Sequence, residues 1–195
     1  MESKSLITDS SDQQTNDETL MLAYADGDAA AFEQLYHKHK VVVYRFFVKQ
    51  YLPLAVAEEL THDTWLKIIN ARDDYVVTAK FTTYLFTIAR RLAIDYHNKK
   101  SNRCEVSKED ELVQASSTIQ NTHADENKNR VLSEALTQQI ALLPFEQREV
   151  FLLKQEAGFN IDDIAKITGE KKEKIKSRWR YALKKLREGL SGYVN

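Results

Sequence analysis

The chain has 195 residues with a formal net charge of −1, and it contains only 5 Gly, 2 Pro and 1 Cys. So few turn-forming residues argue against a barrel or sandwich, and the composition excludes collagen-like and low-complexity chains. No apolar run approaches the roughly 20 residues of a membrane span, so we predict no membrane insertion. The single cysteine, Cys104, excludes an internal disulfide and a cysteine-based zinc site, and it fits a reducing cytosol.

The near-neutral charge conceals a strong polarity along the sequence. Residues 1–17 carry −3 and residues 104–129 carry −4, whereas residues 130–195 carry +4. Within 166–187, ten Lys or Arg residues accompany only two glutamates. This basic segment is a candidate site for binding a polyanion, although a solvated helix face explains the same composition equally well.

Helical periodicity dominates the first half of the chain. Residues 1–16 are rich in Ser, Asp, Gln and Thr, which predicts a disordered tail and no secretory signal. Asp28 suits a helix N-cap, and Pro53 suits the first turn of another helix. We expect a loop over residues 71–79. The helices predicted in this half span about 17–25, 29–51, 53–70 and 81–100.

Periodicity disappears over residues 101–129, where Ser, Asn, Gln and acidic residues dominate, so we predict an acidic flexible linker. Beyond it we expect helices over about 126–141, 144–157, 161–168 and 171–190, and a short tail over 191–195. The predicted fold class is therefore all-α, with two small helical domains over residues 17–100 and 130–190 joined by the linker.

Residues 160–181 have the pattern of a helix-turn-helix. A short apolar helix ends at Gly169, which can adopt the left-handed conformation of a sharp turn. The next helix has an apolar stripe of Ile175, Trp179, Ala182, Leu183 and Leu186. Its opposite face is polar and mostly cationic: Glu173, Lys174, Ser177, Arg178, Arg180, Tyr181, Lys184 and Lys185. Such a helix fits the major groove of DNA, and an ordinary helical hairpin is the plainer alternative.

The segment 143–188, which contains this motif, resembles region 4 of the sigma-70 family, in particular of the small extracytoplasmic-function sigma factors. The resemblance is carried by Leu-Pro-x-x-x-Arg-Glu-Val-Phe at its start, Asp-Ile-Ala in the first helix and Ile-Lys-Ser-Arg in the second. It implies contact with the −35 promoter element by Lys172, Glu173, Lys176, Ser177, Arg178 and Lys184. Arginine can pair with guanine and glutamate with cytosine, whereas Lys172 and Lys184 suit phosphates.

The predicted helix over 53–70 has an apolar stripe and a second, mixed face. We expect Leu54, Ala57, Leu60, Thr61, Thr64, Trp65 and Ile68 to be buried. The run Ala57 to Ile68 resembles region 2.2 of the family, which docks on the clamp helices of RNA polymerase. The resemblance implies core binding by Glu59, His62, Asp63 and Leu66. His62-Asp63 stands where the family usually has Gln-Glu or Gln-Asp.

The predicted helix over 81–100 interleaves aromatic residues, hydroxyls and arginines, a composition that suits single-stranded DNA. A tyrosine packed beneath a neighbouring helix would explain part of the same pattern. The run Phe81 to Lys100 resembles regions 2.3 and 2.4, which melt and read the −10 element. The resemblance implies −10 contacts by Tyr84, Thr87, Arg90, Arg91 and Asn98. In the family, the loop over 71–79 captures an unstacked base.

The two resemblances, in this order, predict a cytoplasmic sigma factor. Its partners would be core RNA polymerase and promoter DNA, and it would direct initiation from a restricted promoter set. An anti-sigma factor is a candidate further partner. Two alternatives are a helix-turn-helix regulator that acts without core polymerase and a sequestering protein that uses the 2.2-like helix alone.

We predict no enzymatic activity, no catalytic residue, no cofactor and no metal. The spacing of Glu59 and His62 is that of a di-iron site, but the chain has no second Glu-x-x-His. It also has neither a glycine-rich phosphate loop nor a nucleophile elbow.

Overall fold

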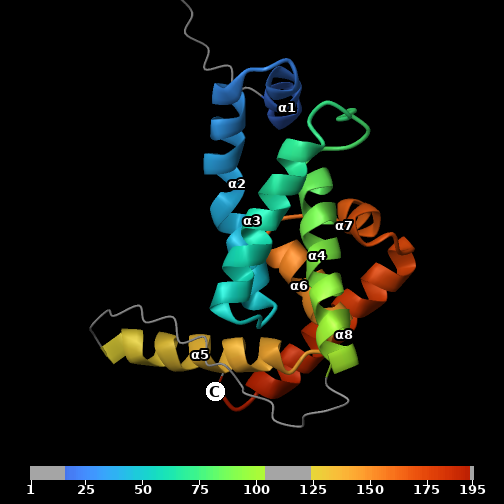
Figure 1. Cartoon of the computed structure of the whole chain (residues 1–195). Coiled ribbons are helices and arrows are strands. Elements are labelled where there is room, and N and C mark those ends of the chain that lie inside the picture. Colours follow the sequence, from blue (N-terminus) through green and yellow to red (C-terminus); the bar gives the residue numbers. More distant parts are fainter. Residues whose placement is uncertain (1–15, 104–123, 194–195) are drawn as a thin grey trace, which may run out of the picture.

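A computed structural model describes residues 16–103 and 124–193, and within these ranges all regular structure is α-helical (Figure 1). The helices are α1 (Asp17–Ala25), α2 (Ala29–Lys49), α3 (Leu54–Asn70), α4 (Phe81–Arg103), α5 (Ala124–Ala141), α6 (Phe145–Gln155), α7 (Ile161–Thr168) and α8 (Lys172–Leu190). The predicted all-α class is confirmed. We call α1–α4 the N-terminal unit and α5–α8 the C-terminal unit.

The predicted linker needs a correction at both ends. Residues 101–103 continue α4, and residues 124–129 open α5, so the range 101–129 is helical at its edges. Polar side chains there do not prevent a helix that is already nucleated from extending by another turn. The remainder of the linker, Cys104 included, lies outside the described residues, as do residues 1–15 of the predicted tail.

Side-chain caps fix where the first helices begin. The Asn16 side chain accepts a hydrogen bond from the Glu18 amide, and Asp28 accepts from the amides of Ala30 and Ala31. The Glu18 carboxylate accepts from the Phe81 amide at 2.6 Å, at the start of α4. An anion at a helix N-terminus is favourable, so Glu18 ties α1 to the predicted −10 helix.

The buried stripe of α3 follows most of the prediction. Ala57, Leu60, Thr64, Trp65 and Ile68 are all buried. Leu54, in contrast, is 50% exposed, because it begins the helix where no neighbour covers it, so the prediction that it is buried was wrong. Thr61 is only half-buried.

Two histidines of α2 have opposite environments. His39 is buried, and its Nε2 lies 2.9 Å from an Asp17 carboxylate oxygen, while His37 is exposed and lies beside Glu33. Burial lowers the pKa of His39 below its ordinary value of 6.5, although Asp17 partly opposes this effect.

We therefore expect the free energy of unfolding to decrease as the pH falls below 6.5. Between the lowered native pKa of His39 and 6.5, the unfolded chain binds a proton at His39 and the native chain does not. Urea titrations at several pH values should show a weaker pH dependence for His39→Gln and an unchanged one for His37→Gln. Equal pH profiles for the two variants would contradict this origin.

A short helix and a tight turn organise the C-terminal unit. The Asn160 side chain accepts from the Asp163 amide at 2.8 Å and caps α7. Gly169 has φ of +70°, which is the left-handed conformation that glycine adopts without strain. The turn sets α8 against α7 and α6, and α5 packs across α8. This confirms the helix-turn-helix predicted over 160–181.

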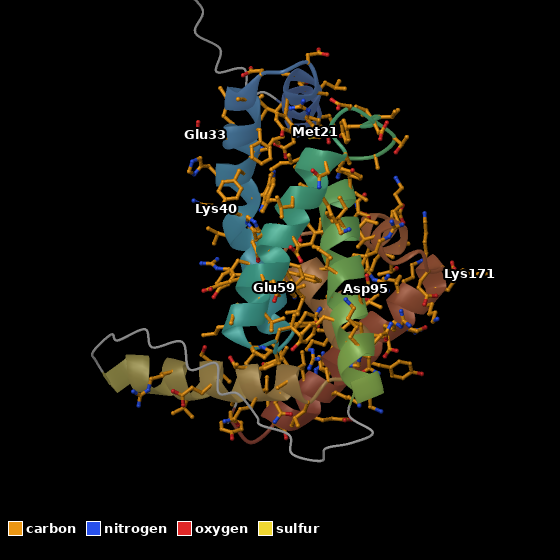
Figure 2. The ribbon with its side chains drawn as sticks, viewed as in Figure 1. Met21, Glu33, Lys40, Glu59, Asp95 and Lys171 are labelled. Atoms are coloured by element: carbon orange, nitrogen blue, oxygen red, sulfur yellow. The ribbon has the colours of Figure 1, made fainter. Side chains whose placement is uncertain are left out.

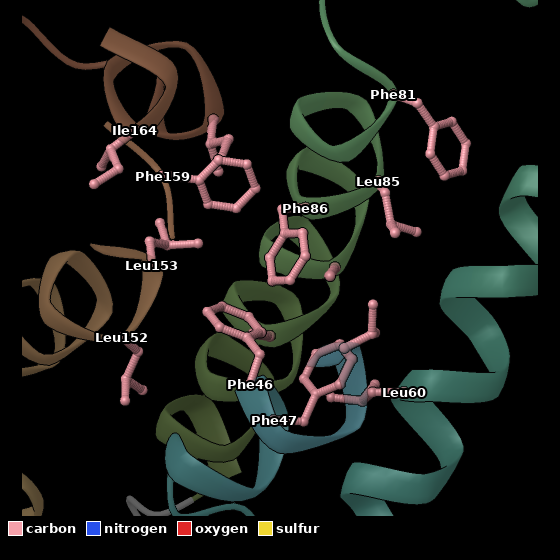
Figure 3. Close-up of a cluster of buried hydrophobic side chains, with 14 of the residues drawn as sticks. Phe46, Phe47, Leu60, Phe81, Leu85, Phe86, Leu152, Leu153, Phe159 and Ile164 are labelled. Carbon is pink, nitrogen blue, oxygen red and sulfur yellow. The ribbon is translucent and has the colours of Figure 1, made fainter. Parts of the chain in front are cut away.

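The two units share one continuous hydrophobic core. Phe46, Phe81, Leu85 and Phe86 from the N-terminal unit belong to the same cluster of buried residues as Leu152, Leu153, Phe159 and Ile164 from the C-terminal unit (Figure 3). The Phe86 and Phe159 rings meet edge to face with centroids 5.1 Å apart. Helix α4 lies beside α7 along this boundary (Figure 1). The sequence predicted two separate domains and gave no sign of this contact.

Candidate nucleic-acid and polymerase interface

Helix α8 presents most of the residues predicted to read the −35 element. Lys172, Glu173, Lys176 and Lys184 are exposed, and Ser177 is half-buried beside them. At 3.6 residues per turn, Glu173, Ser177, Arg180 and Lys184 lie along one side of the helix. On this side Arg180 and Lys184 can donate hydrogen bonds, and the Glu173 carboxylate can accept them. Base edges in the major groove require both kinds of group.

A shallow groove runs along this side of α8. It is lined by Lys154, Ile161, Glu173, Lys176, Ser177, Trp179 and Arg180. Trp179 stacks on Phe151 with ring centroids 5.8 Å apart, and the Lys154 ammonium lies over the Trp179 ring. The Trp179 indole therefore packs against α6.

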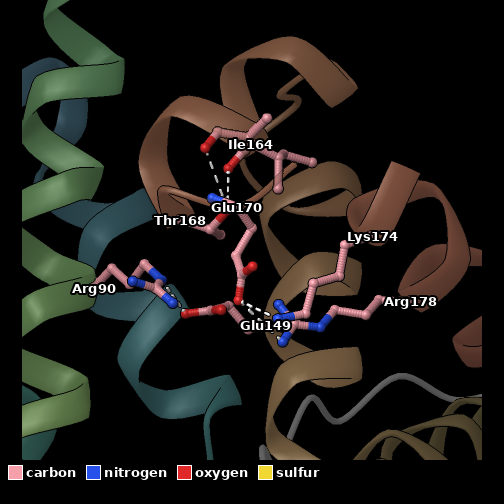
Figure 4. Close-up of polar contacts among 8 residues, drawn as sticks. Arg90, Glu149, Ile164, Thr168, Glu170, Lys174 and Arg178 are labelled. Carbon is pink, nitrogen blue, oxygen red and sulfur yellow. Dashed lines mark hydrogen bonds and ion pairs between the residues drawn. The ribbon is translucent and has the colours of Figure 1, made fainter. Parts of the chain in front are cut away.

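Arg178 does not lie on this exposed side. Its side chain is 16% exposed, and one of its terminal nitrogens contacts Glu170 at 3.4 Å (Figure 4). Its positive charge also acts on the buried Glu149. The expectation that Arg178 points toward solvent is therefore corrected, because its place on the helix turns it toward α6 and the α7–α8 turn. Arg180, which the sequence analysis left out of the −35 contacts, occupies the exposed side instead.

The predicted −10 residues fall on two different sides of α4. Arg91 and Asn98 are exposed, Tyr84 and Thr87 are half-buried, and Arg90 faces the C-terminal unit. The Tyr84 ring lies 5.4 Å from that of Tyr75 in the loop before α4, and burial raises the pKa of Tyr75 to about 12. These neutral rings at the edge of the loop offer a surface on which a base could stack.

An ion pair joins α4 to α6. The Arg90 Nε donates to the Glu149 carboxylate at 2.7 Å, and the two side chains are 17% and 1% exposed (Figure 4). Burial raises the pKa of Glu149, and Arg90 and Arg178 partly offset that rise. The second carboxylate oxygen of Glu149 is buried without a hydrogen bond. A buried carboxylate of this kind depends strongly on the arginines around it.

The predicted core-binding residues share one face of α3. Glu59 (Figure 2), His62 and Leu66 are exposed, and Asp63 is half-exposed. Leu66 is 40% exposed, which places an aliphatic side chain among carboxylates. An apolar centre within a polar rim is typical of a protein-binding surface.

A groove between α2 and α3 extends this face. Its lining combines aromatic rings with charged groups: Tyr36, Lys40, Val41, Tyr44, Glu58, Thr61, His62 and Trp65. Trp65 is buried, and its indole N–H has no hydrogen-bond partner. The contribution of α2 to this surface was not predicted from the sequence. Val41 of α2 is an apolar residue that is exposed, whereas most apolar residues of this helix are covered.

Residues 16–103 and 124–193 contain no group of three or more metal-ligating side chains. Glu59 and His62, which have the di-iron spacing, are both exposed on α3. Over the same residues, no helix is both long and apolar enough to cross a membrane.

The arrangement defines a class of protein. One unit carries a helix-turn-helix whose last helix has a mostly cationic exposed side, and the other carries the mixed polar and aliphatic face of α3 beside the tyrosines and arginines of α4. A helix-turn-helix with a cationic second helix is typical of DNA-binding proteins.

The family models specify the class further. Residues 35–103 match the model described as Sigma-70 region 2, and residues 133–186 match that described as Sigma-70, region 4. The chain belongs to the sigma-70 family, and its relatives place it among the extracytoplasmic-function sigma factors, which are DNA-binding initiation factors.

Relatives match over almost the whole chain. It is 29% identical to the RNA polymerase sigma factor CarQ of Myxococcus xanthus over 169 residues, which cover 86% of this chain and 94% of the relative. It is 27% identical to the ECF RNA polymerase sigma factor SigL of Mycobacterium tuberculosis over 164 residues, or 84% and 90% of the two chains. The sigma factor RpoE of Bartonella quintana, solved with the anti-sigma factor NepR, has a similar fold, with a TM-score of 0.70 at 24% identity over 82% of this chain and 96% of that one.

Proposed function

We propose that three surfaces divide the work of this sigma factor. The α3 face, which consists of Glu59, His62, Asp63 and Leu66 with the α2–α3 groove, docks on core polymerase. Helix α4 and the preceding loop contact the −10 strand through Tyr84, Thr87, Arg90, Arg91 and Asn98. The exposed side of α8 reads the −35 element through Lys172, Glu173, Lys176, Ser177, Arg180 and Lys184. The observation that carries the proposal is the presence of all three surfaces on one chain.

The same proposal places the protein in the cytoplasm, where it acts through polymerase and not as an enzyme by itself. Its working domains are residues 17–100 and 130–190. The fold it shares with a sigma factor solved in complex with an anti-sigma factor supports a protein of that class as a further partner. A regulator that acts without core would leave the α3 face without a role.

In vitro transcription tests the proposal directly. Purified chain, core polymerase and a library of genomic fragments should yield transcripts from a restricted set of start sites. The matched control is core polymerase alone, which should not select these sites. Specific DNA binding without any start-site-dependent transcript would contradict the proposal and favour the regulator that acts without core.

We expect Arg180→Ala and Lys184→Ala to have different effects on binding to the −35 element. Arg180 lies in the groove beside Glu173 and Ser177, so its loss should cost about 1–3 kcal/mol and relax the preference at particular bases. Lys184 lies farther along the helix and suits a phosphate, so its loss should weaken all sequences alike. It should also reduce the salt slope by about one ion.

Titrations of holoenzyme against a randomised −35 library at two salt concentrations separate the two effects. Lys185→Ala is the control, since Lys185 is exposed one position away from the proposed side. Uniform losses for both Arg180→Ala and Lys184→Ala would place base reading on Glu173, Lys176 and Ser177 alone.

A further inference from the structure

The first two residues of α1 contact two other helices. The Asp17 carboxylate accepts a hydrogen bond from the Lys38 ammonium at 2.7 Å and lies 2.9 Å from Nε2 of the buried His39, and both partners belong to α2. The neighbouring Glu18 carboxylate accepts from the Phe81 amide at 2.6 Å, at the first residue of α4. The Asp17 side chain is only 13% exposed, and Glu18 is half-buried. The start of α1 therefore connects α2 to α4.

The residue that precedes α4 cannot cap this helix. The amides in the first turn of a helix have no partners within the helix, and a side chain just before the helix usually accepts from one of them. The residue before α4 is Lys80, whose ammonium can only donate. The first turn of α4 also contains no acidic residue. The Glu18 carboxylate of α1 therefore supplies the acceptor and the negative charge that stabilise the start of α4.

The loop over residues 71–80, which leads into α4, is held near its other end by the same helix. The Arg72 guanidinium lies over the ring of Tyr24 at 5.7 Å, and Tyr24 is a buried residue of α1. Between the two ends the loop is open, since Val76 is 70% exposed and Val77 is 46% exposed. Figure 1 shows this loop next to α1. Helix α1 thus contacts the loop soon after it begins and contacts α4 where the loop ends.

The two tyrosines proposed to stack on a base lie at the same corner. The Tyr75 ring lies 6.5 Å from Phe81 and 5.4 Å from Tyr84. Burial raises the pKa of Tyr75, and the negative charges of Glu18 and Asp17 raise it further, so both carboxylates act on the loop. The Tyr75 hydroxyl is buried without a hydrogen-bond partner. A displacement of the start of α4 from α1 would therefore also displace the two rings.

We propose that α1 holds the loop over 71–80 and the start of α4 in the geometry that binds the −10 strand, with Glu18 as the positioning residue. The inference rests on the function proposed above. Fixing the backbone of a loop costs conformational entropy, and a loop that is already ordered does not incur that cost when it binds. Glu18 acts through the Phe81 amide and not by contact with DNA.

Amide exchange in the free chain tests this anchoring without DNA. We expect Glu18→Ala to increase exchange of the Phe81 and Tyr84 amides by about tenfold or more, because the first turn of α4 loses its charged acceptor. Glu18→Gln keeps an acceptor oxygen and should recover part of the protection. Glu33→Ala, which removes a glutamate that is 72% exposed on α2, is the matched control and should change neither amide. Unchanged exchange in Glu18→Ala would overturn the proposal.

Binding of a single-stranded −10 oligonucleotide by holoenzyme tests the positioning role. We expect binding to be about five- to tenfold weaker for Glu18→Ala, because the loop must then be ordered on binding, with partial recovery in Glu18→Gln. The affinities for core polymerase and for a −35 duplex should stay unchanged, whereas a residue that merely stabilised the whole chain would affect all three. Equal −10 binding by Glu18→Ala and the unsubstituted chain would contradict the positioning role.

Arg72→Gln covers the case in which Glu18→Ala unfolds. The Arg72 side chain is 45% exposed, so its replacement leaves the core in place while the contact with the Tyr24 ring is lost. We expect weaker −10 binding with an unchanged salt dependence. If Arg72 instead contacted a phosphate of the single strand, its loss would reduce the salt slope by about 0.7. A reduced slope, or unchanged −10 binding, would contradict the anchoring of the loop through Arg72.

The two measurements separate this inference from the proposed function. If exchange at Phe81 depends on Glu18 but unsubstituted holoenzyme binds no −10 oligonucleotide, the proposed −10 function is refuted while the anchoring by α1 stands. If the unsubstituted chain and both Glu18 variants bind the oligonucleotide equally well, the positioning role is refuted while the proposed function stands.

Discussion

Reversal of the charge at Asp63 should strongly weaken the binding of core polymerase while the fold remains intact. Asp63 is half-exposed on the α3 face, beside the exposed Glu59 and Leu66 and away from the buried stripe of that helix. A like charge placed against a complementary partner surface costs several kcal/mol. We expect Asp63→Arg to weaken core binding by about 30-fold or more, which corresponds to about 2 kcal/mol.

Binding of labelled chain to core polymerase, together with a thermal melt of the free chain, measures both parts of this expectation. Asp26→Arg is the control, because Asp26 is exposed in the turn after α1 and does not belong to the α3 face. Normal core binding by Asp63→Arg would refute the assignment of this face. A variant that unfolds would show instead that Asp63 supports the N-terminal unit.

Loss of Arg178 should destabilise the C-terminal unit. Arg178 is largely buried, contacts Glu170 and offsets the charge of Glu149, whose side chain is 1% exposed. Removal of one partner from a fully buried ion pair costs about 3–5 kcal/mol. Because Glu170 is 29% exposed and its charge is partly screened by solvent, we expect Arg178→Ala to lower the free energy of unfolding by about 2 kcal/mol.

That loss should lower the melting temperature by several degrees, with Arg178→Lys intermediate because lysine keeps the charge without the fork of donors. Arg180→Ala is the matched comparison, since Arg180 is exposed and its loss should leave the melting temperature unchanged. If Arg178→Ala instead melts normally and relaxes base preference at the −35 element, then the direct reading role predicted from the sequence is correct.

The helices followed from local features of the sequence. Asp28 caps α2 through its own carboxylate, and Gly169 takes the left-handed turn that only a residue without a side chain adopts freely. The apolar period of α3 predicted five of its buried residues correctly. These features are local, so a single sequence suffices to predict them. The resemblances to region 2 and then to region 4 along the chain predicted the family.

The direction of Arg178 and the contact between the units depended on the tertiary structure. Helical periodicity predicts where a side chain lies around the axis of its helix. Which of two polar sides of that helix is covered depends on the neighbouring elements that pack against it. For α8, the covering groups are Glu170 and Glu149, of which Glu149 belongs to a different helix. The pairing of Arg90 with Glu149 joins residues 59 positions apart, and no local pattern encodes such a contact.

Local sequence features and the two resemblances were therefore enough to predict the all-α class, the helix-turn-helix and the family, while the residues of the three proposed surfaces stay predictions. The tertiary structure alone decided that Arg180 and not Arg178 lies on the exposed side of α8, and that Phe86 and Phe159 join the two units in one core. The physical reason is the range of the interactions. Caps, turns and helical periods act within a few residues, whereas burial and ion pairing depend on partners that only the folded chain brings together.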